Sequence, residues 1–168
     1  LDNCPEDPGD PGDPGDPGDT VSELTSVRYY PDAHGGDAVR AIGFIADGAE
    51  IRVVSGGEDG NLKTWPLAPD GKPAETEPLD HVIYDLASSI DGSVVVTGEG
   101  GWNGGTETDT LRSWGPGGFY AETRAPIGYV YSVAISPGKS WTVASGFYGD
   151  IVVYDTYELN LHATRKTK

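Results

Sequence analysis

Residues 34–65 read HGGDAVRAIGFIADGAEIRVVSGGEDGNLKTW. Three short apolar runs follow one another in this segment: Val39–Ile45, Ile51–Ser55 and Leu62–Leu67. Asp-Gly pairs at 47–48 and 59–60 separate the runs, and this dipeptide is typical of tight turns that need a positive φ. The segment therefore predicts three antiparallel strands joined in sequence order.

The same pattern recurs twice more along the chain. The first turn of each unit lies at Asp47-Gly48, Asp91-Gly92 and Pro137-Gly138, spaced 44 and 46 residues apart. The third apolar run of each unit carries an aromatic residue near its end: Trp65, Trp114 and Tyr154. A fourth, more polar run closes each unit: Ala74–Leu79, Phe119–Arg124 and Glu158–Arg165. Four short strands with a period in the forties predict an all-β fold built from propeller blades, at about 34–80, 81–125 and 126–166.

These units resemble the WD-repeat (tryptophan–aspartate repeat) family of β-propellers, and the resemblance covers about residues 22–166. It implies a structural tetrad in the first unit, formed by His34, Ser55, Asp59 and Trp65. In such a tetrad the indole is hydrogen-bonded to the serine, the serine to the histidine and the histidine to the aspartate. A buried indole N–H and a buried hydroxyl need such partners.

The second and third units depart from this pattern. The second keeps His81, Thr97 and Trp114, but the insertion Gly100–Asp109 enlarges its turn, so Asp109 is at best the counterpart of Asp59. The third unit has Ser145 and ends in Tyr154-Asp155, and no histidine precedes its first strand.

Three blades are fewer than a closed ring needs, because propellers usually have four to eight. We therefore expect a partial propeller of about three four-stranded antiparallel blades, with two open apolar faces. Another chain, a second copy of this chain or further sequence of a longer protein would complete it. Leu24–Tyr30 is an additional strand candidate.

Charge and hydropathy restrict the function classes. The chain has 168 residues, with 27 acidic against 11 basic ones and a formal net charge of −16. Nucleic-acid binding is not expected, since it needs clustered lysine and arginine. No apolar run approaches 18 residues, so we expect no transmembrane segment.

The first 21 residues form an acidic tail with four Asp-Pro-Gly repeats. Proline, glycine and mutually repelling aspartates predict a flexible spacer, and calcium binding by these carboxylates is the alternative. Cys4 is the single cysteine and a candidate lipid anchor, although Asp2 and Asn3 are not the small residues that normally precede such a cysteine. A spacer of this kind favours an extracytoplasmic location, in a bacterial envelope or secreted, over the cytoplasm.

The sequence contains no signature of an enzyme, a metal site or a cofactor site. The leading hypothesis is a non-enzymatic protein-interaction or assembly module, in which a rigid scaffold presents loops to a protein partner. The alternative is a carbohydrate-binding propeller that uses the insertion, with Trp102, Asn103 and Asp109 as the binding residues.

Overall fold

The computed structural model describes residues 30, 32–67, 76–79, 81–103 and 106–165, without the side chains of residues 76 and 102–108. The chain divides into two units, Leu1–Pro31 and Asp32–Lys168. The fold described below is that of the second unit. The predicted tail and nearly all of the strand candidate Leu24–Tyr30 lie outside the described residues.

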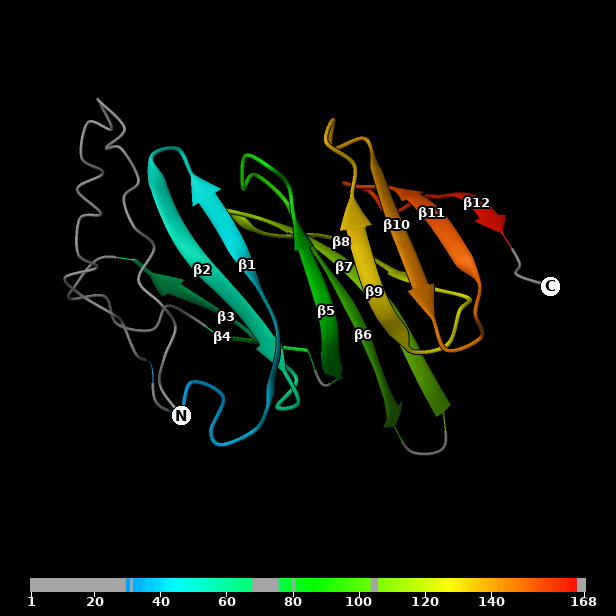
Figure 1. Cartoon of the computed structure of the whole chain (residues 1–168), viewed down its shortest axis with the longest axis horizontal. Helices are drawn as coiled ribbons and strands as arrows, with labels where there is room; N and C mark the ends of the chain where they lie inside the picture. Colours follow the sequence, from blue (N-terminus) through cyan, green and yellow to red (C-terminus); the bar gives the residue numbers. More distant parts are fainter. Residues whose placement is uncertain (1–29, 31, 68–75, 80, 104–105, 166–168) are drawn as a thin grey trace, which may run out of the picture. The chain divides into compact units, whose positions relative to one another are not determined.

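The second unit consists of three four-stranded antiparallel sheets, in which β1, β5 and β9 are the innermost strands (Figure 1). Blade 1 contains β1 (Val39–Asp47), β2 (Glu50–Gly57), β3 (Asn61–Pro66) and β4 (Thr76–Pro78). Blade 2 contains β5 (Val82–Ser88), β6 (Val95–Asn103), β7 (Thr106–Gly115) and β8 (Gly118–Arg124). Blade 3 contains β9 (Val130–Ile135), β10 (Trp141–Gly146), β11 (Ile151–Asp155) and β12 (Leu161–Arg165). Each sheet pairs its strands in sequence order, and the prediction of an all-β partial propeller is confirmed.

The tight turns show why the Asp-Gly signals predict the hairpins. Gly48 and Gly92 have φ values of 59° and 69°, which an L-residue rarely adopts. The third turn differs from the prediction, because the positive φ of 58° falls on Lys139 and not on Gly138. Lys139 gains a compensating contact there, since its ammonium lies 2.6 Å from the Asp91 carboxylate of blade 2.

The insertion after Thr97 is not the enlarged turn that the glycines predict. Strands β6 and β7 continue to pair through it, from Gly100 opposite Asp109 to Asn103 opposite Thr106. The segment therefore lengthens a regular hairpin. Its threonines explain the difference, because β-branched residues favour extended pairing.

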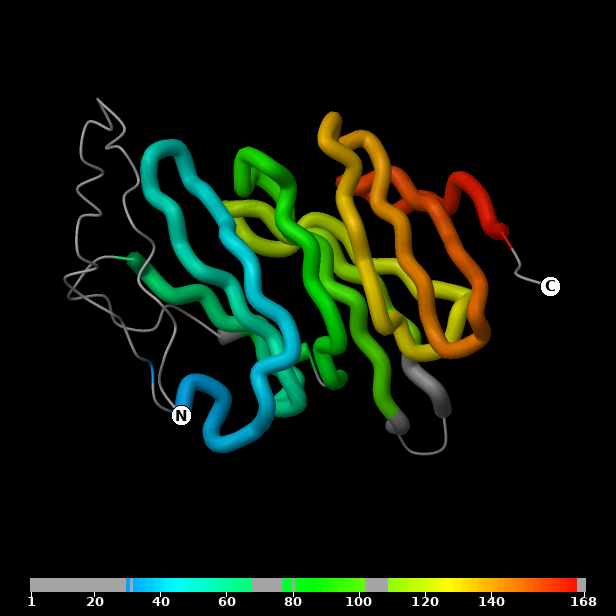
Figure 2. The backbone as a smooth tube through the Cα atoms, viewed as in Figure 1, coloured from blue at the N-terminus to red at the C-terminus, as the bar shows by residue number. Residues whose placement is uncertain are grey.

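Neighbouring blades share apolar cores, and the tube in Figure 2 shows the three sheets following one another. Blades 1 and 2 bury Ala41, Ile45, Val54, Leu62, Leu79, Ile83, Leu86, Val95 and Trp114. Blades 2 and 3 bury Val96, Leu111, Ala125, Ile127, Val130, Val133, Ala144, Val152, Tyr154 and Leu159. Each blade thus buries the residues of one sheet face against the opposite face of the next blade.

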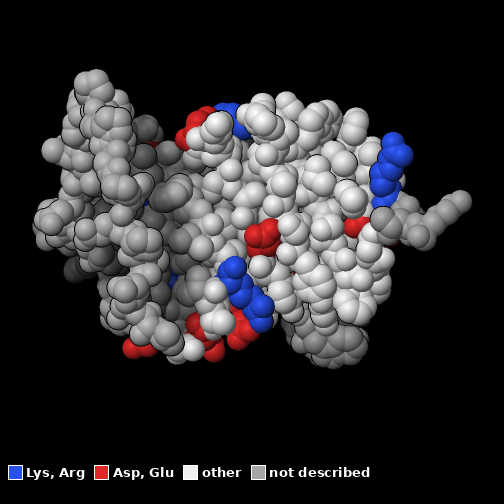
Figure 3. Space-filling model, in the orientation of Figure 1, with Lys and Arg blue, Asp and Glu red and all other residues white. Residues whose placement is uncertain are grey.

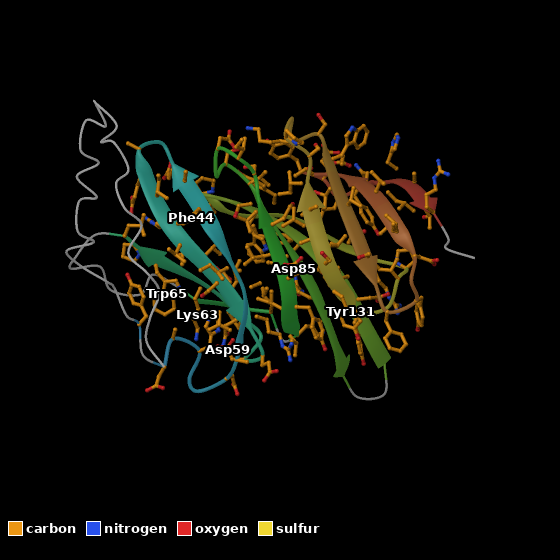
Figure 4. The ribbon with its side chains drawn as sticks, in the orientation of Figure 1. Phe44, Asp59, Lys63, Trp65, Asp85 and Tyr131 are labelled. Carbon is orange, nitrogen blue, oxygen red and sulfur yellow. The ribbon has the colours of Figure 1, made fainter. Side chains whose placement is uncertain are left out.

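Side chains of β5 bind the free backbone donors of both neighbouring inner strands. The Phe44 N–H of β1 donates to Ser88 Oγ at 3.1 Å. The Val133 N–H of β9 donates to the Asp85 carboxylate at 2.9 Å. Figure 4 labels Phe44 and Asp85 on these strands. An edge strand exposes unpaired donors, and these bonds satisfy two of them while joining the blades.

Two glycines allow the blades to approach closely. A Cβ on Gly56 would lie 2.6 Å from Ile83 Cγ2, and one on Gly98 would lie 2.7 Å from Val130 Cγ1. Both glycines occupy the same register position, opposite Leu62 and Leu111 of the third strands. The blade spacing therefore depends on the absence of a side chain at this position.

Candidate functional site

The four residues of the expected tetrad in blade 1 are joined by hydrogen bonds. Trp65 Nε1 donates to Ser55 Oγ at 2.8 Å, and Ser55 Oγ lies 2.8 Å from His34 Nε2. His34 Nδ1 lies 2.7 Å from Asp59 Oδ1. These bonds are satisfied together when His34 carries its proton on Nδ1 and the serine donates to Nε2. Asp59, Lys63 and Trp65 are labelled in Figure 4.

The Asp59 carboxylate is held in its charged form. Burial alone would raise the pKa of this carboxyl, but hydrogen bonds from Lys63, Asn61 and His34 together hold the pKa well below its usual range. Lys63 Nζ donates to Asp59 Oδ2 at 2.8 Å and also to the Ala33 carbonyl at 2.8 Å. The network therefore connects the segment before β1 to the β2–β3 turn and to β3.

Blade 2 builds a different network around the same indole position. Trp114 Nε1 donates to Thr97 Oγ1 at 3.2 Å, and Thr97 Oγ1 donates to Glu99 at 2.7 Å. The Arg112 guanidinium donates to the other oxygen of Glu99 and also to Glu122 at 2.8 Å. A buried glutamate and an arginine thus occupy the place that aspartate and lysine have in blade 1.

His81 and Asp109 do not take the roles that blade 1 assigns to His34 and Asp59. His81 Nδ1 lies 3.9 Å from Glu99 Oε2, beyond hydrogen-bond distance. Asp109 pairs with Gly100 in the hairpin, and its carboxylate accepts a bond of 2.6 Å from Arg124 Nε.

Glu99 is fully buried, and this changes its acidity. Burial raises the pKa of its carboxyl to about 7, although the Arg112 charge and the Thr97 and Arg112 hydrogen bonds act in the opposite direction. The carboxyl therefore changes its protonation near neutral pH, inside the core of blade 2.

Blade 3 has no hydroxyl group at the position that Ser55 and Thr97 occupy in the other two blades. The register sets Ala144 of β10 opposite Val152 of β11, as it sets Ser55 opposite Lys63 and Thr97 opposite Arg112. The expectation that Ser145 is the counterpart of Ser55 is wrong by one residue. Ser145 pairs with Ile151 and occupies the position of Gly56 and Gly98. Blade 3 therefore joins blade 2 through apolar packing at this level.

The structure places the three predicted binding residues on one hairpin. Trp102 pairs with Glu107 and Asn103 with Thr106, whereas Asp109 lies further along, opposite Gly100. The side chains of Trp102 and Asn103 lie outside the described residues. Their part in binding is still a prediction, and Asp109 is described through its ion pair with Arg124.

An aromatic cluster near the inner strands is a feature that the sequence reasoning did not identify as a group. Tyr84 of β5 contacts Tyr129 and Tyr131, with ring centroids 6.0 and 5.2 Å apart. Phe147 contacts Tyr129 and Tyr131, and the Arg40 guanidinium lies 5.4 Å from the Tyr84 ring centroid. Tyr131 is labelled in Figure 4. The residues come from three blades, so sequence spacing carries no signal for this cluster.

Two classes of site find no support within the described part of the chain. No three side chains of histidine, cysteine, aspartate or glutamate are grouped there in a way that could hold a metal ion. The described residues also include no helix of the length and hydropathy needed to cross a membrane.

The outer face of blade 3 exposes residues that the other blades bury. Val54, Val96 and Val143 occupy equivalent positions on the second strands of the three blades. Each of them directly follows the residue that pairs with the aromatic residue of the third strand. Val54 and Val96 are 1% and 0% exposed, and each lies in a core shared with the following blade. Val143 is 38% exposed. Blade 3 therefore presents to solvent the surface that blades 1 and 2 use for packing.

The outer face of blade 1, at the opposite end of the series of three sheets, also exposes a residue whose counterparts are buried in the other blades. Ile42, Leu86 and Val133 share one position of the inner strand, opposite Ser55, Thr97 and Ala144. Leu86 and Val133 are each 7% exposed, whereas Ile42 is 68% exposed. In the view of Figure 3, most of the described surface is uncharged.

Three four-stranded antiparallel sheets packed in sequence order, none of them closed, define a partial β-propeller. Residues 23–66 match the family model WD40, described as WD domain, G-beta repeat. Residues 23–66 are therefore identified as a WD repeat, and the three sheets are consistent with a WD-repeat β-propeller of about three blades. A search of curated proteins found no match to the chain.

Proposed function

We propose that this protein is a non-enzymatic interaction and assembly module whose two end faces are covered by other protein in the functional particle. WD repeats generally mediate protein–protein interaction or assembly. The observation that carries the proposal is the contrast between Ile42 or Val143 and their buried counterparts on the inner blades. Apolar residues at positions that elsewhere form blade cores favour association over exposure to water.

The surface charge adds a bias toward basic partners. The whole chain, acidic tail included, has a net charge of −16, and a negative field of this kind accelerates encounters with positively charged proteins. The apolar end faces supply affinity, and the charge supplies selection. The covering protein is a second copy of this chain, another subunit or further sequence of a longer protein.

Native mass spectrometry of the purified particle tests the proposal. We expect a mass above the 17.7 kDa of one chain, as a homo-oligomer or as a complex with a second protein. Ile42→Asp and Val143→Asp place a charge on each end face and should release the single chain. Ile90→Asp is the matched control, because Ile90 is 89% exposed on the turn after β5 and belongs to neither face.

A folded monomer whose mass is unchanged by all three substitutions would contradict the proposal. Loss of the assembly in the control as strongly as in the two end-face variants would also contradict it, since the effect would then follow from added charge alone.

Carbohydrate binding by the β6–β7 hairpin is the second candidate function. Three further residue pairs extend this hairpin past Gly100 and Asp109, and one of them contains Trp102. Exposed aromatic residues on rigid supports commonly serve recognition. A glycan array with the wild type and Trp102→Ala separates this role from a purely structural hairpin.

A further inference from the structure

A cavity of about 610 Å³ lies between the outer strands of blades 2 and 3. It is lined by Asp109, Arg124, Pro126, Tyr148, Tyr154 and Leu161, among others. Its volume falls in the range of small-molecule sites, which are mainly apolar with a few fixed polar groups. The cavity uses no residue of either end face, so it does not depend on assembly.

The polar groups of the cavity form a neutral pair. The side chain of Asp109 is only 7% exposed, and its Oδ1 accepts a hydrogen bond of 2.6 Å from Nε of Arg124. The Arg124 side chain is 70% exposed. A buried carboxylate has the capacity to accept further bonds, and its own charge is balanced by the guanidinium.

Tyr154 adds a polar group with unmet hydrogen-bonding capacity. It is 1% exposed, and its hydroxyl has no hydrogen-bond partner among the described residues. Burial, together with the nearby Asp109 charge, raises the pKa of Tyr154 to about 12. The phenol is therefore neutral and able both to donate and to accept. A buried hydroxyl without a partner is costly, so a ligand that hydrogen-bonds to it from the cavity would remove this cost.

The chemistry of the lining restricts the ligand. Asp109 and Arg124 together carry no net charge, so the pair favours neither a free cation nor a free anion. The polar groups need a neutral partner that both donates and accepts hydrogen bonds, and Pro126, Tyr148 and Leu161 need an apolar surface. A sugar ring has vicinal hydroxyls on its edge and C–H groups on its face.

We propose that this cavity binds a saccharide ring, with two hydroxyls hydrogen-bonded by Asp109 and Tyr154 and a ring face packed against Tyr148. The Asp109 carboxylate accepts from one hydroxyl. The Tyr154 hydroxyl donates to or accepts from its neighbour. Arg124 holds the carboxylate in place through Nε.

Saturation-transfer NMR and calorimetry with glucose, galactose, mannose and N-acetylglucosamine test this proposal on the full chain in its native assembly. We expect at least one of the four sugars to bind. Asp109→Asn should weaken that binding by roughly tenfold or more, because a hydrogen bond to a charged group is lost. Tyr154→Phe should weaken it by a smaller factor while leaving the ring packing intact. Tyr120→Ala is the control, since Tyr120 is an exposed tyrosine on β8 that does not line the cavity.

Three results would overturn the proposal. The first is no binding of any of the four sugars by the folded wild type. The second is binding that Asp109→Asn and Tyr154→Phe leave unchanged. The third is binding that Trp102→Ala abolishes and the two cavity variants retain, which would place the sugar on the hairpin. Circular dichroism of each variant shows whether it folds, and Tyr154→Phe should fold normally because it removes a hydroxyl with no described partner.

Discussion

Glu99→Gln measures how a buried carboxyl affects the stability of blade 2 at different pH values. The pKa of Glu99 rises from 4.5 in an unfolded chain to about 7 in the fold, chiefly because of burial. Between these two pH values the folded protein keeps a proton that the unfolded chain releases. The stabilising contribution is therefore complete below pH 4.5 and is lost as the pH rises through 7.

The size of this effect follows from the shift. At about 1.4 kcal/mol per pKa unit, the change amounts to about 3 kcal/mol of unfolding free energy. Glutamine does not titrate, so the stability of the wild type relative to Glu99→Gln should fall by this amount between pH 4.5 and pH 8. Urea unfolding at fixed protein concentration provides the assay. Trp114 reports on this region through fluorescence, because its indole donates to Thr97 beside Glu99.

A control and an opposite outcome complete the experiment. Glu122→Gln removes the other carboxylate bound to Arg112. The Glu122 side chain is half exposed, so this substitution should change the free energy of unfolding by less than about 1 kcal/mol. If the stability of the wild type relative to Glu99→Gln is constant or rises with pH, the Arg112 charge outweighs burial and the reasoning is refuted.

Three further substitutions test the blade network and the blade spacing. Ser55→Ala removes the partner shared by the Trp65 indole and His34, and should cost about 1–3 kcal/mol in urea unfolding, against little change for Ser132→Ala on the exposed part of β9. Asp59→Asn should destabilise the protein most near neutral pH, because the depressed pKa of Asp59 contributes stability that is lost as the pH falls; an effect independent of pH would contradict this. Gly56→Ala places a Cβ 2.6 Å from Ile83 Cγ2 and should cost about 1–3 kcal/mol, whereas Gly117→Ala meets nothing within 4 Å and should cost far less. Equal melting temperatures for these two glycine variants would show that the blades adjust without strain.

Apolar alternation and turn chemistry predicted the strands well, because both act locally. Val39–Ile45 and Ile51–Ser55 fall within β1 and β2, and Asp-Gly pairs place Gly48 and Gly92 where a positive φ is needed. The resemblance to WD repeats also located the first network, in which Ser55 lies ten residues before Trp65. Ten residues before Tyr154 lies Ala144. The sequence alone was therefore sufficient to identify Ala144, and not Ser145, as the counterpart of Ser55.

Other features depend on contacts that the sequence does not reveal. Glu99 and Arg112 look like ordinary surface charges, and only the register of β6 and β7 brings them together in a buried place. The cavity at Asp109 likewise joins strands from two blades. The tail, Cys4 and the extracytoplasmic location lie outside what the described residues address, and they stay predictions.

The residue at the glycine position differs in the last blade, and this limits what can cover it. Gly56 and Gly98 leave room for Ile83 and Val130 of the following blade, but blade 3 has Ser145 there. A neighbour placed at the internal spacing would collide with the Ser145 Cβ. A protein that covers blade 3 must therefore stand further off or present a smaller residue at that point, so the outer joint is not a repeat of the two inner ones.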